Sequence, residues 1–340
     1  MKKIYYLFLC FCFLVPVVQA QQKPPFNQYL LNAYLINPAL TGVENYADVK
    51  TSYRSQWSGL DGAPVTFYLT AHSPLGKKDR SSSTISLPAK SKNAIIQELR
   101  FKEENDFKPL YAHHGMGGMV IADKIGPFKR LGAQLSYAYH QPVFQDKMKF
   151  SAGISAGFTR YSIDFARLNF GPDTDPVVLQ YRQADLLPEL GLGLNLYGKN
   201  YYLGASAAQL FQNTLSGDKK NLYRFRNQYF LMGGYEYRYN QEVALVPSLL
   251  VKWMQPSAVS VDLNLKVSYL RKIWGGLSYR RQNAVAILAG CNLKSLVNVG
   301  YAYELSDSRL QNQHNGSHEL LMGFIFNNRY RIHNPSDFNW

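Results

Sequence analysis

The residue types that most often bind metals or activate nucleophiles are sparse in this chain of 340 residues. The histidines are His72, His113, His114, His140, His314, His318 and His333. Their spacing does not resemble a zinc site, in which ligands come in closely spaced pairs. We interpret them as loop or lumen residues and expect neither a metal site nor a cofactor.

Other patterns that can carry chemistry fail on their context. Gly115, Gly117 and Gly118 resemble a phosphate loop, but they lead into the strand-like VIADKI rather than into a helix. No Gly-x-Ser-x-Gly nucleophile elbow is present in the sequence. Cys291 lies in AVAILAGCNLK, whose apolar residues predict an inert thiol that is packed or faces lipid. Because acid, base and nucleophile do not cluster, the sequence predicts a protein that is not an enzyme.

The elements that position the functional residues are predicted to be long β-strands. Residues 259–269 read VSVDLNLKVSY, so apolar residues alternate strictly with polar ones. A membrane-spanning strand needs roughly 9–11 residues, whereas a soluble strand is usually nearer 5–6. The pattern recurs along the chain behind an export signal. We therefore predict an all-β fold, a transmembrane antiparallel β-barrel.

Alternation along the whole chain predicts about fourteen strands. They are expected at 45–56, 65–73, 115–125, 130–140, 148–160, 188–197, 200–208, 227–239, 243–253, 258–269, 273–281, 284–294, 296–304 and 319–327. From the fourth strand on, short and long connections alternate in part, as in barrels with short periplasmic turns and longer outer loops. If both chain ends are periplasmic, the long connections 161–187, 209–226 and 305–318 face outward.

The N-terminus predicts export. Lys2 and Lys3 precede the apolar stretch 4–18, and Val18-Gln19-Ala20 predicts a signal peptide over residues 1–20 that is cleaved after Ala20. Cleavage removes Cys10 and Cys12 and leaves Cys291, so no intramolecular disulfide is expected. No later segment approaches the roughly 20 apolar residues of a membrane helix. The predicted location is the outer membrane of a Gram-negative bacterium.

The composition supports a barrel and constrains its partners. The chain has 25 tyrosines and 18% charged residues, against about 25% in typical proteins, and aromatic girdles are characteristic of barrels. Its formal charge is +14, which becomes +12 without Lys2 and Lys3. We expect no nucleic-acid partner, since the chain is exported and has no nucleic-acid fold signature. Attraction to outer-membrane lipid headgroups or to acidic partners explains the charge better.

Two segments do not fit the barrel pattern. Residues 21–42 carry Tyr29, Leu30, Tyr34, Leu35 and Ile36, which would form an exposed apolar patch in water. We hypothesise that this segment folds back under or into the barrel. The predicted organisation is thus a periplasmic or plug segment (21–44), a barrel (45–327) and a tail (328–340).

The second exception is the connection 76–114, which falls where a short turn is expected. Its first half is polar and serine-rich, and residues around 95–101 could form a short amphipathic helix. A mobile loop and a periplasmic docking element both remain open.

Inward-facing residues of the predicted strands are the candidate site. Gly191, Gly193 and Asn195 face inward, as do the small residues between Ser151 and Gly157, which leaves room for water, a plug or a partner's segment. Arg54 and Gln56 share the inward face of the first strand. Arg54 is expected either to fix the plug or to grip a bound protein tail.

At the end of that strand, Trp57 precedes Asp61-Gly62, which is a strong hairpin signal. Among the predicted outer loops, residues 170–181 include Phe170 and Tyr181, which are candidate anchors for a partner.

Four segments resemble the PorP/SprF family of outer-membrane proteins of the type IX secretion system. They are QYLLNAYLINPALTG at 28–42, YRSQWSGLDGAPVTFYLTAHSPL at 53–75, VIADKIGP at 120–127 with LSYAYHQPV at 135–143, and SHELLMGFIF at 317–326. The most specific parts are the Asn-Pro-Ala-x-x-Gly that begins at Asn37 and Pro38, and the Tyr-Arg-x-Gln-Trp-x-Gly-x-Asp-Gly-Ala-Pro of residues 53–64. The long connection 76–114 and the tail depart from the family pattern.

The resemblance implies a non-catalytic component of protein secretion and, for SprF-like members, of gliding motility. It implies as partners the C-terminal domain of a secreted type IX cargo, a periplasmic OmpA-like peptidoglycan-binding protein and the secretion ring and motor. The alternative is a diffusion channel or a transporter of small apolar ligands with an N-terminal hatch, which inward glycine and serine residues suit equally well.

Overall fold

The computed structural model describes residues 29, 31–44, 46–76, 111–144, 148–164, 184–198, 200–211, 226–240, 242–254, 259–270, 272–281, 284–293, 296–306 and 314–326. The predicted signal peptide, the amphipathic stretch around 95–101 and the tail lie outside these residues. Among the described residues, no helix has the length and apolar character needed to cross a membrane.

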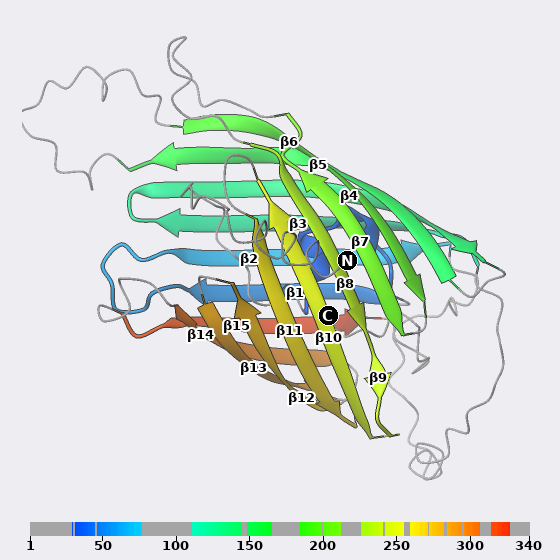
Figure 1. The fold of residues 1–340 in the computed structure, drawn as a ribbon. Helices are drawn as coiled ribbons and strands as arrows, with labels where there is room; N and C mark the ends of the chain where they lie inside the picture. Colours follow the sequence, from blue (N-terminus) through cyan, green and yellow to red (C-terminus); the bar gives the residue numbers. More distant parts are fainter. Residues whose placement is uncertain are drawn as a thin grey trace, which may run out of the picture.

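The described strands form one antiparallel sheet that closes on itself (Figure 1). In chain order they are β1 (Ala47–Ser55), β2 (Val65–Leu75), β3 (His113–Ile125), β4 (Phe128–Val143), β5 (Met148–Ile163), β6 (Ala184–Gly198), β7 (Tyr201–Ala208), β8 (Gln228–Tyr235), β9 (Tyr237–Arg238), β10 (Val243–Trp253), β11 (Ser260–Tyr269), β12 (Ile273–Arg280), β13 (Ala284–Leu293), β14 (Val297–Ser306) and β15 (Ser317–Phe326). β1 pairs with β15, and β10 pairs with β11, so that the ladder has no gap. Closure leaves no sheet edge in lipid, which confirms the predicted antiparallel barrel.

Fourteen strands make the barrel, and β9 is a short additional strand. The sequence predicts one strand over 227–239, but the structure divides it into β8 and β9 at Glu236. The register of β10 with both pieces is continuous, and Pro247 is the residue of β10 opposite the end of β8. Because proline has no N–H to donate, the ladder is interrupted there without a change of register.

The predicted alternation is confirmed, with apolar residues on the outside. On β11, Leu263 and Leu265 are 52% and 44% exposed, while Asp262 and Asn264 on the opposite face are 0% and 6% exposed. A soluble sheet buries its apolar face, whereas a membrane barrel presents that face to hydrocarbon. This strand therefore has the polarity of a membrane wall, with its polar side chains in the lumen.

Several strands are longer than predicted. β3, β4, β5 and β6 run side by side as the longest part of the wall (Figure 1). The sequence predicts a strand from 188, whereas β6 begins at Ala184, and Pro188 pairs with Phe158 of β5. β6 pairs with β7 only over Leu192–Tyr197, so Pro188 lies in a part of the strand with one neighbour, where a missing N–H is tolerated.

Candidate functional site in the barrel lumen

The lumen is filled in part by the chain's own N-terminus. We call the described residues 29 and 31–44 the N-terminal segment. It contains two short 3-10 helices, η2 (Ala33–Leu35) and η3 (Pro38–Leu40), and every residue of both is buried. Figure 1 shows the segment enclosed by the strands. The predicted insertion of this apolar stretch matches where the structure places it.

Asn37 and Pro38 begin the helix η3, and Asn37 also binds it to the wall. The Asn37 side-chain oxygen accepts a hydrogen bond from Ala39 N at 2.9 Å, which caps the helix, and Pro38 occupies its first position. The Asn37 side-chain amide also donates to Leu194 O of β6 at 3.1 Å. One side chain therefore both forms the turn and fixes it to the barrel.

Inward glycines make room for that turn. A Cβ at Gly193 of β6 would overlap Asn37 Oδ1, and a Cβ at Gly153 of β5 would overlap Pro38 O. At Gly204 of β7, a Cβ would lie 2.9 Å from Asn37 Nδ2. Larger residues at these places would exclude the segment. The N-terminal segment thus fills the space that these small inward residues leave in the lumen.

Three histidines hold the point where the chain leaves the lumen. His140 Nε2 lies 2.8 Å from Thr41 O, and His113 Nε2 lies 3.0 Å from Gly42 O. Because carbonyl oxygens only accept, both ring nitrogens donate. Gly42 N donates to His72 Nδ1 at 3.2 Å. The histidines come from the adjacent strands β2, β3 and β4, so they fix the backbone of residues 41 and 42 from one side of the barrel.

Further polar contacts tie the segment to β2 and β4, and one ties it to β11 on another part of the wall. Tyr34 Oη lies 2.6 Å from Ser136 Oγ, and the Asn32 amide donates to Thr70 Oγ1 at 2.9 Å. The Asn264 amide of β11 donates to Tyr29 Oη at 2.5 Å. Burial raises the pKa of Tyr34 to about 12, so its hydroxyl is neutral at physiological pH. Contacts therefore reach both halves of the wall.

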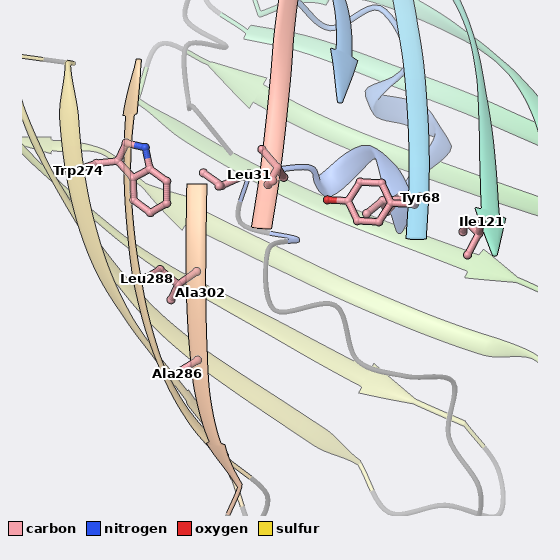
Figure 2. Close-up of a cluster of buried hydrophobic side chains, with 9 residues drawn as sticks. Leu31, Tyr68, Ile121, Trp274, Ala286, Leu288 and Ala302 are labelled. Carbon is pink, nitrogen blue, oxygen red and sulfur yellow. The ribbon is translucent and has the colours of Figure 1, made fainter. Parts of the chain in front are cut away.

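Apolar side chains of the segment pack against the wall in two clusters. Leu31 and Leu35 pack in a cluster with wall residues of β2, β3, β12, β13, β14 and β15, several of which Figure 2 shows around Leu31. Those wall residues are Tyr68, Ile121, Trp274, Ala286, Leu288, Ala302 and Leu321. A second cluster joins Tyr29, Leu40 and Val43 to Tyr202, Met232 and Leu250. The segment thus buries its own apolar residues inside the barrel.

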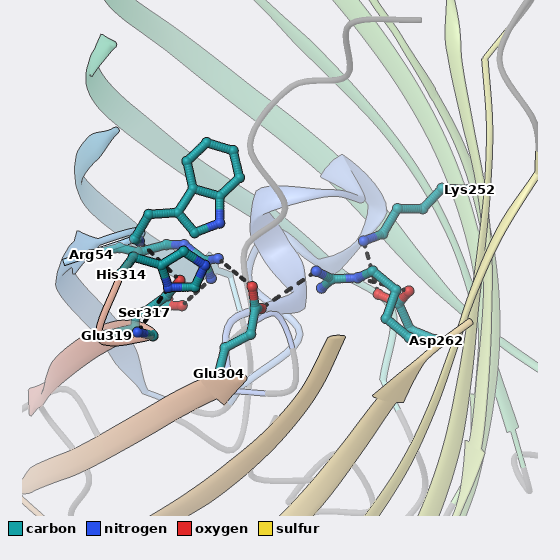
Figure 3. A network of polar contacts seen from close by, with 10 residues as sticks. Arg54, Lys252, Asp262, Glu304, His314, Ser317 and Glu319 are labelled. Atoms are coloured by element: carbon teal, nitrogen blue, oxygen red, sulfur yellow. Dashed lines mark hydrogen bonds and ion pairs between the residues drawn. The ribbon is translucent and has the colours of Figure 1, made fainter. Parts of the chain in front are cut away.

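A chain of ion pairs crosses the lumen near the ends of β1 and β14 (Figure 3). Arg54 contacts Glu319 and Glu304, both at 3.2 Å. Arg280 then links Glu304, at 3.4 Å, to Asp262, at 3.2 Å, and Lys252 lies 2.8 Å from Asp262. Arg54 is 2% exposed, as predicted for an inward residue. Its ion-pair partners are carboxylates of the wall.

A second group of charges lies on the other side of the barrel. Arg130 of β4 contacts Asp123 of β3 at 3.1 Å and Glu189 of β6 at 3.6 Å. Gln134 donates to the same Glu189. Both groups lie toward the end of the barrel away from the histidines, since Asp123 is near the end of β3, which begins at His113, and Arg130 is near the start of β4. This half of the lumen is polar and internally paired.

The loop after β1 is joined by its backbone to the loops on both sides. Gln56 N donates to Pro64 O at 2.9 Å, and Trp57 begins the turn with a φ of 52°. Ser58 N donates to Gly316 O at 2.8 Å, and Asn315 N donates back to Ser58 O at 2.8 Å.

On the other side of the same loop, Gly126 N donates to Gly62 O at 2.9 Å, while Asp61 is exposed. We call residues 56–64, 125–128 and 314–317 the loop rim. Trp57, Asp61 and Gly62 thus lie together in a fixed rim, whereas Phe170 and Tyr181 lie outside the described residues.

Sequence reasoning missed the partners of these residues. It did not single out Glu304, Glu319, Asp262 or the roles of His72 and His140. Alternation within each strand places all of them inward, so facing direction was available from sequence. Which inward residues meet across the barrel depends on strand register, which the sequence does not display. Among the described residues, no group of three or more His, Cys, Asp or Glu side chains is placed to hold a metal ion.

Comparison with solved structures finds other outer-membrane barrels. The toluene transporter TbuX of Ralstonia pickettii has 11% identity and a TM-score of 0.45, with 87% of this chain and 92% of that chain covered. The toluene transporter TodX of Pseudomonas putida has 10% identity and a TM-score of 0.45, covering 90% and 95%. OmpF of Salmonella typhi has 10% identity and a TM-score of 0.34, covering 82% and 96%. At such identities the likeness says nothing about function.

No curated protein matches the sequence. The family model described as "Type IX secretion system membrane protein PorP/SprF" matches residues 18–324. That range includes the N-terminal segment, the loop rim and every strand through most of β15. The chain therefore belongs to the PorP/SprF family of type IX secretion system membrane proteins.

Proposed function

We propose that this outer-membrane barrel is a non-catalytic, protein-binding component of type IX secretion and not an open pore. The observation that supports this most is the N-terminal segment, which is bonded to wall strands on both sides of the lumen and packed in two apolar clusters. A barrel closed by its own chain is suited to holding partners at its two ends. The partners proposed are a secreted cargo's C-terminal domain and a periplasmic peptidoglycan-binding, OmpA-like protein with the secretion ring and motor.

The loop rim is the surface proposed to meet the cargo. With both chain ends in the periplasm, the rim faces outward, because it lies at the far end of β1. Its backbone bonds between neighbouring loops hold it in one conformation, and a preorganised surface loses less entropy on binding. Because the family includes SprF-like members, the proposal extends to gliding motility.

Site-specific photo-crosslinking in intact cells tests this proposal. A benzophenone amino acid at Asp61, exposed on the rim, is expected to capture a secreted protein. The same probe at Leu135, which is 75% exposed on the outward face of β4, is the matched control and is expected to capture no secreted protein. Capture of the same secreted protein from both positions, or from neither in cells that secrete normally, would contradict the proposed rim.

The alternative function is transport of small apolar ligands past an N-terminal hatch. One observation favours it, namely that the lumen contains buried apolar clusters beside the segment (Figure 2). Uptake of an aromatic hydrocarbon into vesicles containing the purified protein discriminates the two. Uptake above that of empty vesicles, with no captured protein, would favour the transporter.

A further inference from the structure

Three cations lie together on the outward face of the barrel. Lys124 of β3, Lys129 of β4 and Arg160 of β5 are all exposed. Each follows the outward alternation of its strand, with Val120, Leu131 and Phe158 on the same face. We call these three residues the cationic patch. It is separate from the lumenal ion pairs, because Asp123 and Arg130, the next residues on β3 and β4, point inward.

The strand register brings the charges close together. Lys124 is directly opposite Lys129, and Arg160 is opposite Leu131, one outward position below Lys129. Side chains directly opposite in an antiparallel pair lie about 5 Å apart at Cβ, and like charges there are destabilising. The patch therefore has an electrostatic cost that a bound anion would remove.

The protein supplies part of the compensation. Asp164 lies 3.2 Å from Lys129, and the Lys129 side chain remains 50% exposed. Within the described part of the chain, neither Lys124 nor Arg160 forms an ion pair with a carboxylate. Among the described residues near this turn, Asp61 on the neighbouring loop is also exposed. Within this described part of the surface, the three cations therefore outnumber the two carboxylates.

The residues around the patch indicate its depth in the membrane. Leu131 and Phe158, beside and below Arg160, are 53% and 58% exposed and face hydrocarbon. The register row of Arg160 continues through Leu131, Ala122 and Phe67 to Tyr53, which is 53% exposed. Outward tyrosines mark the membrane interface of barrels. The patch thus lies where the apolar band ends and lipid headgroups begin.

We propose that the cationic patch binds the phosphate group of an anionic lipid headgroup. The acyl chains of that lipid lie along Leu131 and Phe158, while its phosphate contacts Lys124, Lys129 and Arg160. The guanidinium group donates two parallel hydrogen bonds to phosphate, and the ammonium groups act as point charges.

Native mass spectrometry of the full chain, titrated with phosphatidylglycerol in detergent, tests the proposal. The variant Lys124→Gln/Arg160→Gln leaves the Lys129–Asp164 pair intact. The control Lys272→Gln/Arg281→Gln removes the same charge from two other exposed positions. Each cation near a membrane surface contributes about 1 kcal/mol, so the patch variant is expected to hold the first lipid roughly 10- to 30-fold more weakly than the control. Thermal unfolding in the same detergent verifies that both variants are folded.

Two outcomes would overturn the proposal. Equal lipid retention by the patch variant and the control would show that total charge, and not this patch, governs binding. Displacement of phosphatidylglycerol by inorganic phosphate at equal concentration would show an ion site without lipid specificity. Retention of phosphatidylglycerol over phosphatidylcholine, together with loss in the patch variant alone, would support it.

Discussion

Asn37 lies so close to Gly193 that a Cβ on the glycine would overlap the Asn37 side-chain oxygen. The Asn37 amide also donates to the carbonyl oxygen of Leu194, the next residue of β6. The Asn-Pro-Ala-x-x-Gly motif therefore packs directly against the inward glycines of the wall. This contact explains the glycines at positions 153, 193 and 204 of the wall.

Replacing Gly193 by valine is expected to displace the N-terminal segment while leaving the barrel folded. The displacement is measured by the reactivity of a cysteine at position 41, introduced as Thr41→Cys in a Cys291→Ser background. Thr41 is 0% exposed, so this cysteine is protected while the segment is in place. This cysteine should react with a small maleimide at least about 10-fold faster in the valine variant. A loss of about 1.4 kcal/mol in the free energy that holds the N-terminal segment in the lumen is enough for that change. Gly275→Val is the matched control, because its nearest neighbour to a new Cβ is Leu288 O at 3.8 Å. Equal labelling rates in the two valine variants would contradict the packing of Asn37 against Gly193.

Removing Arg54 is expected to destabilise the barrel more than removing a single carboxylate partner. Arg54→Met leaves Glu304 and Glu319 buried without this cation, and breaking such a pair typically costs about 3 kcal/mol or more. Glu319→Gln leaves Arg54 paired with Glu304 and should cost less. Urea unfolding in lipid vesicles, followed by tryptophan fluorescence, measures both. A smaller loss for Arg54→Met than for Glu319→Gln would contradict the ion-pair chain.

Alkaline pH is expected to loosen the N-terminal segment through Tyr34. Burial raises the pKa of Tyr34 from 10.0 to about 12, so the folded state retains a proton that the unfolded state loses. The stabilisation is fully present below pH 10 and is lost as the pH rises toward 12. Protease cleavage of the segment should accelerate over this window, and Tyr34→Phe should reduce the acceleration. Identical pH profiles for the parent and Tyr34→Phe would exclude this tyrosine as the cause.

A disulfide should lock the segment in the lumen. Thr41 Oγ1 donates to Ser136 Oγ at 3.0 Å, and cysteine sulfurs at these two positions need to approach to about 2.05 Å. Thr41→Cys/Ser136→Cys in the Cys291→Ser background is expected to cross-link on mild oxidation and to withstand protease until it is reduced. Failure to cross-link in the folded protein would place the segment elsewhere.

Strict alternation made the barrel predictable. In β11, every second residue is apolar, and no competing period exists in that stretch, so the wall and its facing direction follow from the sequence. The split of β8 and β9 was not predicted, because the cause lies in Pro247 of the neighbouring strand. Strand ends such as Ala184 depend similarly on pairing with a neighbour.

The sequence predicted that a segment fills the lumen, but it did not predict which residues meet there. Apolar Tyr34 and Leu35 ahead of the first strand indicated a buried segment, and small inward residues indicated space for it. The meeting of Arg54 with Glu304 and Glu319 required knowledge that β1 closes against β15, a contact between residues far apart in the chain. Sequence periodicity sets which side of a strand a residue faces, whereas barrel closure decides what it meets there.

Single-channel conductance in planar bilayers, with and without residues 22–41, tests the closed lumen most directly. The account predicts little conductance for the parent protein and a large, stable increase for the deletion variant, since the wall strands remain while Asn37, Leu40 and Thr41 no longer fill the lumen. The same conductance and the same unfolding midpoint for both proteins would contradict the claim that the chain's own N-terminus closes this barrel.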